Sequence, residues 1–313
     1  MRVAVIGTGN IGRKHLRLLS AEPEVELAAV LSTREENAVA AAEQWGGRPY
    51  TSLRELLAKE DIDAAWVCVP PAAHGPIEHT LIEHGVPFFV EKPLSADRQT
   101  AEGIGAALRA CGLIAGVGYH WRAMDTIPEV RRALADNPPR MVLGAWHDKV
   151  PPPPWWIYRA LSGGQIVEQA THLFDIARVL VGEARVVAAA ATRFGRTAYP
   201  EADIAEASAV LLRYASGATG MFTATSLLQG LVAAHVQFFC EGVIITLNEH
   251  ELIYDTGIER RRVPRTNDPT VDENRAFLRA VSLKDPSMLF CTYEDALLTH
   301  RLCFDASEAE LVG

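Results

Sequence analysis

The chain has 313 residues, of which 49% are hydrophobic and 22% charged, and its formal net charge is −9 at pH 7. This length predicts about two domains, and the composition is that of a globular chain with a sizeable core. The acidic balance, without a long run of Lys or Arg, excludes the usual electrostatic footprint of nucleic-acid or anionic-membrane binding. "RRVPR" at 261–265 is interpreted as a short solvated turn. No apolar stretch approaches the roughly 18 residues of a membrane span.

The N-terminal stretch and the cysteines predict a cytoplasmic protein. "MRVAVIG" is too short for the apolar core of a signal peptide. The cysteines are five, an odd number, and they are spread along the chain, mostly within apolar runs. This pattern favours free thiols in a reducing compartment over a disulfide framework or a zinc site.

Strands and helices alternate along residues 1–120. Apolar runs at 2–6, 25–32, 64–69, 86–90 and 112–118 predict buried strands, and helical spacing fills the intervals between them. Such alternation predicts a doubly wound parallel α/β sheet, and we assign residues 1–120 to one domain of this kind.

Three unusual stretches stand where strands of this domain end. They are "GTGNIG" after the first strand, "PPAAH" at 70–74 and "EKP" at 91–93. A G-x-G-x-x-G placed between a first strand and a helix is a strong signal for a dinucleotide, whose pyrophosphate binds at the helix N-terminus. In doubly wound sheets, ligands bind at the carboxyl ends of the strands. The predicted cofactor contacts are Gly7, Thr8, Gly9, Asn10, Ile11, Gly12, Val69, Pro70, Pro71, His74, Glu91, Lys92 and Pro93.

The end of the second strand indicates which dinucleotide is preferred. NAD sites usually carry an acidic residue there for the ribose diol, whereas this chain has Ser32, Thr33 and Arg34. Hydroxyls and a guanidinium suit the 2′-phosphate of NADP. Glu35 and Glu36 follow directly and oppose that phosphate, so NAD remains the second choice.

Residues 121–313 form a second predicted domain. Many strand-like runs between 141 and 263, with hairpin turns such as Ser216–Gly217, predict an α+β domain on a large, mostly antiparallel open sheet. One helix is expected at 163–182, where Glu168 and His172 are four residues apart and share a face with Asp175. These side chains either crosslink the core or meet a ligand; a metal site that adds His147 lacks a supporting ligand pair.

The motifs "GTGNIG", "EKP" and "GG…E…H..D", in this order, resemble those of the glucose–fructose oxidoreductase and inositol dehydrogenase family (Gfo/Idh/MocA). The resemblance implies a Rossmann domain, a C-terminal sheet that mediates homodimers or homotetramers, and NAD(P)-dependent chemistry on sugars or polyols. It assigns Lys92 as the catalytic lysine and His172 as the histidine of the catalytic helix, and implies a cis Lys92–Pro93 bond. Glu168 occupies the place of the family's usual aspartate.

The sequence therefore predicts an NADP(H)-preferring oxidoreductase that acts on a C–OH/C=O centre of a small carbohydrate-like molecule, with no metal. His172 would act as general base and acid, Lys92 would stabilise alkoxide charge, and Glu168 would orient His172. Two alternatives stay open: a glycosidase that oxidises and eliminates with transient use of NAD, and a non-catalytic regulator. The predicted substrate contacts are Tyr119, Arg122, Trp156, Tyr158 and Asp175.

Overall fold

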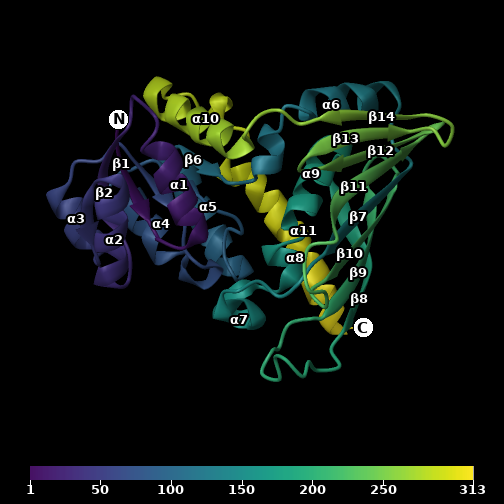
Figure 1. Ribbon diagram of the computed structural model, residues 1–313, viewed down its shortest axis with the longest axis horizontal. Coiled ribbons are helices and arrows are strands. Elements are labelled where there is room, and N and C mark those ends of the chain that lie inside the picture. Colours follow the sequence, from purple (N-terminus) through teal and green to yellow (C-terminus); the bar gives the residue numbers. More distant parts are fainter. Residues whose placement is uncertain (313) are drawn as a thin grey trace. The chain divides into compact units, whose positions relative to one another are not determined.

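The computed structural model describes residues 1–312, and the chain divides into two compact units (Figure 1). The first unit contains Met1–Tyr119 and Thr270–Leu297, and the second contains residues 120–269 and 298–312. The segment Thr270–Leu297 thus belongs to the first unit, although the sequence placed it in the second domain. Helix α10 (Pro269–Leu283) and the start of α11 (Tyr293–Val312) supply it.

The first unit is built on a six-stranded parallel sheet in the order β3-β2-β1-β4-β5-β6. Its strands are β1 (Arg2–Ile6), β2 (Glu26–Leu31), β3 (Arg48–Tyr50), β4 (Ala64–Val67), β5 (Phe88–Val90) and β6 (Ala115–Val117). The helices between them are α1 (Asn10–Leu19), α2 (Glu35–Trp45), α3 (Leu53–Lys59), α4 (Pro76–Glu83) and α5 (Arg98–Cys111). This confirms the predicted doubly wound sheet.

Local sequence sets the ends of these helices, and apolar side chains pack them on the sheet. Asp97 accepts a hydrogen bond from the Thr100 N–H at 2.8 Å and so caps α5, which Gly112 ends with a φ of 68°. One face of the sheet packs against α1 and α10 through residues such as Leu16 and Phe277. The other face packs against α4, α5 and α11, so the unit has three layers.

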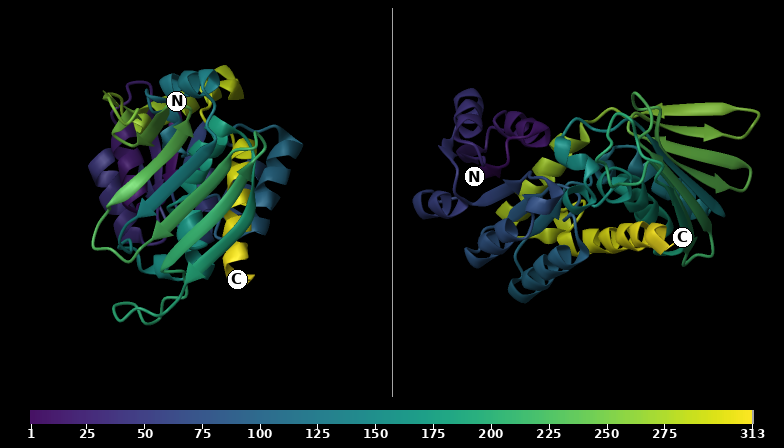
Figure 2. Two further views of the ribbon diagram at one scale, coloured as in Figure 1. Left: turned by 90° about the vertical axis from the view of Figure 1, so that its right-hand side faces the viewer. Right: turned by 90° about the horizontal axis from the view of Figure 1, so that it is seen from below.

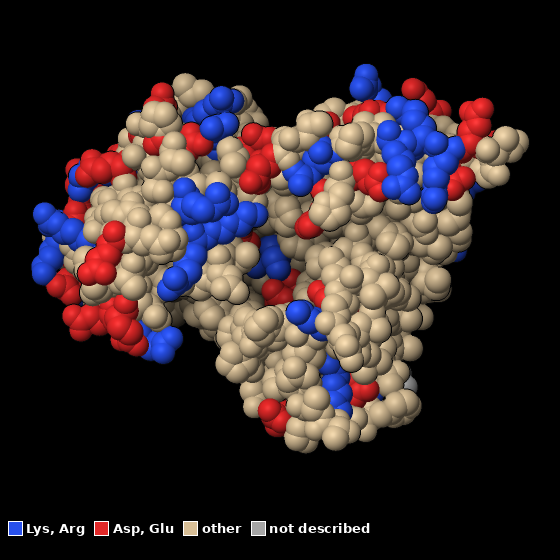
Figure 3. Space-filling model, viewed as in Figure 1, with Lys and Arg blue, Asp and Glu red and all other residues tan. Residues whose placement is uncertain are grey.

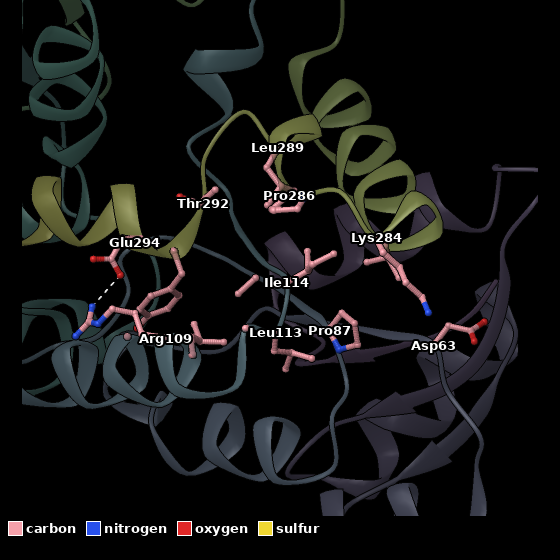
Figure 4. A pocket seen from close by; sticks show the side chains of 16 residues that line it. Asp63, Pro87, Arg109, Leu113, Ile114, Lys284, Pro286, Leu289, Thr292 and Glu294 are labelled. Atoms are coloured by element: carbon pink, nitrogen blue, oxygen red, sulfur yellow. Dashed lines mark hydrogen bonds and ion pairs between the residues drawn. The ribbon is translucent and has the colours of Figure 1, made fainter.

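A cavity of about 770 Å³ lies at the amino-terminal edge of this sheet (Figure 4). Pro87 precedes β5, and Leu113 and Ile114 precede β6, so the cavity opens at the edge opposite to the glycine-rich loop. The Arg109–Glu294 ion pair stands at one end of it, 2.8 Å between Nη1 and Oε2. This cavity is therefore separate from the predicted cofactor edge.

The second unit is built on an eight-stranded sheet in the order β14-β13-β12-β11-β7-β10-β9-β8. All neighbours pair antiparallel except β7 and β10, which confirms the predicted large, mostly antiparallel sheet. The strands are β7 (Met141–His147), β8 (Ala184–Thr192), β9 (Ala207–Tyr214), β10 (Thr219–Thr225), β11 (Ala233–Cys240), β12 (Val243–Asn248), β13 (Glu251–Asp255) and β14 (Arg260–Pro264).

Helices cover one face of this sheet. The long ones are α6 (Ile127–Asp136), α9 (Thr171–Val181) and the later part of α11, which share a core with residues such as Val210, Phe222 and Phe238. Two single-turn helices, α7 (Arg159–Ser162) and α8 (Gln165–Glu168), precede α9. Figure 2 (left) shows the other face of the sheet toward the viewer, with the strands in front of the helices. Nowhere in residues 1–312 is there a helix with the length and hydrophobicity to cross a membrane.

The basic cluster near 261–265 lies on a strand, so its interpretation as a turn was wrong. Arg260, Arg261 and Arg262 belong to β14, where basic side chains gather at the upper right of Figure 3. Each is paired with an acidic side chain of its own unit, namely Asp255, Glu129 and Glu251 respectively. The sequence did not indicate this strand, because three consecutive arginines lack the apolar–polar alternation that is typical of a half-buried strand.

Candidate active site

The glycine-rich loop after β1 has the geometry of a dinucleotide cradle. Gly7 has a φ of 104°, and a Cβ there would lie 2.2 Å from the Cys68 carbonyl oxygen. A Cβ on Gly12 would lie 2.0 Å from the Gly7 carbonyl oxygen, whereas one on Gly9 would meet no atom within 4 Å. The loop therefore closes only with glycines at 7 and 12, and it leaves open space above Gly9 at the start of α1. This fits a pyrophosphate at the helix N-terminus.

The residues after β2 extend this edge. Thr8 Oγ1 donates to Ser32 Oγ at 3.0 Å, and this buried contact links the glycine loop to the end of β2. Thr33 and Arg34 are exposed, and Arg34 stands at the N-cap position of α2. Its Nε lies 3.7 Å from Glu36 Oε1, with both side chains about 70% exposed, so this ion pair is weak and screened.

The stretches after β4 and β5 reach the same edge of the sheet. Pro71 opens a 3₁₀ turn, and the buried His74 follows with its Nδ1 2.6 Å from Glu78 Oε1. Lys92 is partly buried directly after β5, and the Lys92–Pro93 peptide is cis. The ends of β1, β2, β4 and β5 thus bring the predicted cofactor residues to one edge, as the parallel topology requires.

In the second unit, His172 lies at the start of α9 in an aromatic surrounding. Its ring stacks with Trp121 at 6.4 Å and with Trp146 at 5.9 Å between centroids, and it meets the edge of His120 at 4.8 Å. The side chain is only 4% exposed. Aromatic rings on several sides hold the imidazole in one orientation and limit the access of water.

The helix expected at 163–182 is interrupted, which corrects the predicted shared face. Helix α8 ends at Glu168 and α9 begins at Thr171, so Glu168 and His172 do not lie on one continuous helix. Glu168 instead accepts a hydrogen bond from Trp156 Nε1 at 2.7 Å. Apolar spacing did not reveal the break because residues on both sides of it remain buried against the same core.

The predicted substrate residues differ in their burial and in their hydrogen-bond partners. Arg122 and Asp175 form a buried ion pair, with Nε to Oδ2 at 2.7 Å and Nη2 to Oδ1 at 2.5 Å, and Thr299 Oγ1 donates to Asp175 at 2.6 Å. Arg122 and Asp175 thus contact each other in the core, and their predicted contact with substrate stays a prediction. Tyr119 is 1% exposed in the core of the first unit, and Tyr158 remains exposed in the second.

His120 and Glu249, next to the aromatic surrounding of His172, had no signal in the sequence. Glu249, in the turn between β12 and β13, accepts a hydrogen bond from Trp121 Nε1 at 2.8 Å and lies 2.9 Å from His120 Nε2. The His120 contact is the largest of the effects that lower the pKa of Glu249 to about 2. His147, considered as a metal ligand, has its Nε2 2.9 Å from Thr223 Oγ1. More than one hundred residues separate Glu249 from its partners, so no local pattern could connect them.

The fold and the glycine loop define a dinucleotide-binding protein with a second, sheet-based domain. Residues 1–119 match the family described as "Oxidoreductase family, NAD-binding Rossmann fold", and residues 138–242 match the "GFO/IDH/MocA C-terminal domain". The chain therefore belongs to the Gfo/Idh/MocA oxidoreductase family, as its motifs predicted.

Known proteins support this membership over most of the chain. An inositol 2-dehydrogenase of Rhizobium meliloti is 31% identical over 224 residues, which are 69% of this chain and 66% of that protein. The matched region spans about two thirds of the length of this relative, and 64% and 54% of the length of two other curated relatives. GenD2 from gentamicin A biosynthesis, solved with NAD, is 23% identical at a TM-score of 0.85 over 99% of this chain and 94% of its own. KijD10, a 3-ketoreductase of Actinomadura kijaniata solved with NADP, is 23% identical at a TM-score of 0.84 over 96% of this chain and 94% of its own.

Proposed function

We propose that the chain is an NAD(P)-dependent oxidoreductase that transfers a hydride between nicotinamide and a C–OH/C=O centre of a sugar, polyol or related cyclic compound. The observation that carries this proposal is the edge of the first unit, where the glycine-rich loop after β1 and Lys92 after β5 follow the carboxyl ends of strands of the same parallel sheet. The relatives named as inositol dehydrogenase and 3-ketoreductase support the substrate class.

The bound nicotinamide supplies or accepts the hydride, and the side chains of the protein manage the proton and the charge. Oxidation of an alcohol releases the hydroxyl proton as hydride leaves, and imidazole is suited to accept it near neutral pH. We propose His172 for this role, because aromatic rings fix its orientation. We propose that Lys92 stabilises the developing alkoxide through its ammonium group. Reduction of a ketone would use the same groups in reverse.

Glu168 takes a supporting role in this proposal. Trp156 Nε1 holds one carboxylate oxygen at 2.7 Å, so the carboxylate has a fixed position close in sequence to His172. From there it would orient His172 or accept a substrate hydroxyl. The exposed Tyr158 is proposed to contact substrate, whereas Arg122 and Asp175 support α9 from within the core.

NADP is the proposed preferred cofactor. Ser32, Thr33 and Arg34 present no carboxylate where a ribose diol would need one. The guanidinium of Arg34 is largely exposed, and the Asn37 side-chain oxygen and Glu36 lie beside it at the surface. It could exchange these exposed partners for a 2′-phosphate.

A homo-oligomer formed through the open face of the eight-stranded sheet is also proposed. Leu211, Met221 and Leu143 stand in register on adjacent strands, and their side chains alternate with residues buried under the helices. Leu211 and Met221 are 37% and 46% exposed. An apolar row of this kind on a sheet face is typical of an interface. Light scattering of the wild type and of Met221→Glu tests this; a monomeric wild type contradicts it.

The function is tested by mixing the purified chain with NADP or NAD and with a panel of inositols, nucleotide-sugars and keto-sugars, while absorbance at the nicotinamide band is followed. Turnover of free cofactor with one compound class is the expected result. A tightly held cofactor that never exchanges, with glycoside cleavage, would indicate the elimination chemistry. Dinucleotide binding without turnover across the panel would indicate a regulator.

A further inference from the structure

A line of buried polar groups in the first unit ends beside Lys92. Trp66 Nε1, on β4, donates to Asn274 Oδ1 of α10 at 2.9 Å. His15 Nδ1, on α1, lies 2.9 Å from the same oxygen, and His15 Nε2 lies 3.0 Å from Glu91 Oε1. His15 is fully buried, and its ring packs against Phe89 at 5.5 Å between centroids. The proposed reaction uses Lys92 but assigns no role to the side chains of Trp66, Asn274, His15 or Glu91.

The indole N–H of Trp66 fixes the orientation of the Asn274 amide and thereby the protonation of His15 Nδ1. Trp66 Nε1 can only donate, so the amide of Asn274 must turn its oxygen toward it. His15 Nδ1 faces that same oxygen, which accepts but cannot donate. His15 Nδ1 therefore carries a proton and donates it to Asn274.

A second proton is required between His15 and Glu91. Without it, the lone pair of the buried Nε2 and an oxygen of the largely buried carboxylate would face each other at 3.0 Å, which is unfavourable for two acceptors with little access to water. The pair therefore holds one proton, and its net charge is the same whichever partner carries it. The neighbouring titratable groups are Glu273, within the same 4.8 Å cluster, and Cys68, whose pKa burial raises well above its ordinary value, with smaller contributions from Glu91 and Glu273.

The Glu91 carboxylate connects His15 to the backbone of Lys92. Its second oxygen, Oε2, accepts a hydrogen bond from the Lys92 backbone N–H at 3.2 Å. The carboxylate also lies directly over Gly118, where a Cβ would come within 2.7 to 2.9 Å of its three atoms. His15 on one side and the absence of a side chain at Gly118 on another thus define where the carboxylate sits.

We propose that His15 is a positioning residue for Lys92, which it serves by holding the Glu91 carboxylate against the Lys92 backbone N–H. The inference rests on the proposed function insofar as Lys92 is the catalytic lysine. It gives the helix that follows the glycine loop a second task, because the same helix that would receive the pyrophosphate also fixes the segment after β5. Asn274 extends the arrangement to α10, more than 250 residues further along the chain.

The tautomer of His15 is tested first, on the full-length chain labelled with ¹⁵N. Long-range ¹H–¹⁵N spectra at pH 7 report the protonation of each imidazole nitrogen, and the signal lost in His15→Gln identifies His15. A protonated Nδ1 is expected. An imidazole with a proton on Nε2 and none on Nδ1 would overturn the proposal, as would a metal ion retained in a one-to-one ratio by the His15, Glu91 and Glu273 cluster, found by elemental analysis.

Amide hydrogen exchange then tests the positioning without any substrate. His15→Gln removes the imidazole partner. Gly118→Ala displaces the carboxylate, because the three atoms nearest to the added Cβ all belong to it. In both variants the Lys92 amide should exchange about ten- to a hundredfold faster, the range for loss of a hydrogen bond to a charged group. The Glu91 amide, bonded to the Val67 carbonyl at 2.9 Å, serves as the internal reference. Unchanged exchange at Lys92 in both variants would contradict the proposal.

Two matched substitutions control for general destabilisation. His84→Gln changes an exposed histidine at the end of α4, and Gly103→Ala adds a Cβ whose nearest neighbour is 3.8 Å away. Both should exchange and turn over like the wild type. In His15→Gln and Gly118→Ala, kcat should fall about tenfold with the dinucleotide Kd unchanged.

The activity of Lys92→Ala distinguishes two ways in which this account could fail. If Lys92→Ala retains activity, the proposed role of Lys92 is wrong. If Lys92→Ala is inactive while both positioning variants keep wild-type kcat, only the inference about His15 is wrong.

Discussion

Trp156 Nε1 donates a hydrogen bond to Glu168 Oε2 at 2.7 Å, and this contact ties the single-turn helix α8 to the 3₁₀ turn Pro154–Ile157. The indole is buried, and Glu168 is the last residue of α8, before α9 begins at Thr171. Trp156 thus contributes to the position of the Glu168 carboxylate.

Removal of the Glu168 carboxylate is expected to lower kcat by about ten- to a hundredfold, because His172 would lose an orienting or proton-accepting neighbour. Glu168→Asp should be milder than Glu168→Ala, and Trp156→Phe should reproduce part of the loss, with Trp155→Phe as the matched control. Steady-state kinetics measures this. Wild-type rates in both Glu168 variants would show that the residue only supports the fold.

The buried pair of Arg122 and Asp175 is expected to dominate the stability of the second unit. Asp175→Asn keeps the shape and the Thr299 contact but leaves the Arg122 charge without its counter-ion, and loss of one partner of such a pair costs about 3–5 kcal/mol. Urea unfolding measures the change. Glu241→Gln, which breaks an exposed pair with Arg140, should cost about 0–1 kcal/mol. Unchanged stability in Asp175→Asn, together with weaker substrate binding, would restore the ligand role for Asp175.

Acid is expected to weaken the contact of Glu249 with His120 and Trp121. The pKa of Glu249 is lowered from 4.5 to about 2, first by the His120 hydrogen bond. Because the folded state binds this proton less readily than the unfolded chain, the stabilisation is complete above pH 4.5 and is lost as the pH falls toward 2.

Urea unfolding of the wild type and of Glu249→Gln at pH 7, 4.5 and 3 measures this effect. The difference in the free energy of unfolding should shrink at the lowest pH, and Glu259→Gln in an exposed turn is the control. A difference that stays constant from pH 7 to 3 would show that the contact does not depend on the charge of Glu249.

The choice of cofactor is expected to depend on Arg34. One or two charge-assisted hydrogen bonds to a 2′-phosphate, each worth about 1.5–3 kcal/mol, predict a preference for NADPH over NADH of about ten- to a hundredfold after the opposing effect of Glu35 and Glu36. Arg34→Ala should weaken NADPH and hardly change NADH, whereas Arg17→Ala, the same charge change on an exposed part of α1, should change neither. Fluorescence titration decides this, and tighter NADH in the wild type would show that the glutamates prevail.

Much of the first unit could be predicted because its signals are local. The glycines at 7 and 12 are required by contacts with the next few residues and with the end of a neighbouring strand, and each buried strand is a continuous apolar run. The motifs that we predict to contact the cofactor follow strands of one parallel sheet, and this topology brings the carboxyl ends of those strands to one edge.

The parts that the sequence did not reveal depend on distant residues. The break between α8 and α9 leaves the apolar spacing intact, and the contacts of Asn274 with Trp66 and of Glu249 with His120 join positions 208 and 129 residues apart. The buried ion pair between Arg122 and Asp175, which were predicted to contact substrate, likewise had no signal in the local sequence. Polar residues of this kind look the same in a sequence whether they meet a substrate or each other.

The central claim is that Lys92 stabilises charge on the reacting oxygen, and its most direct test is the turnover of Lys92→Ala. The kcat of this variant should fall by about two to four orders of magnitude, while the Kd of the dinucleotide, measured by titration on the same sample, stays within a few-fold of the wild type. A variant that keeps more than about a tenth of the wild-type kcat would contradict the account.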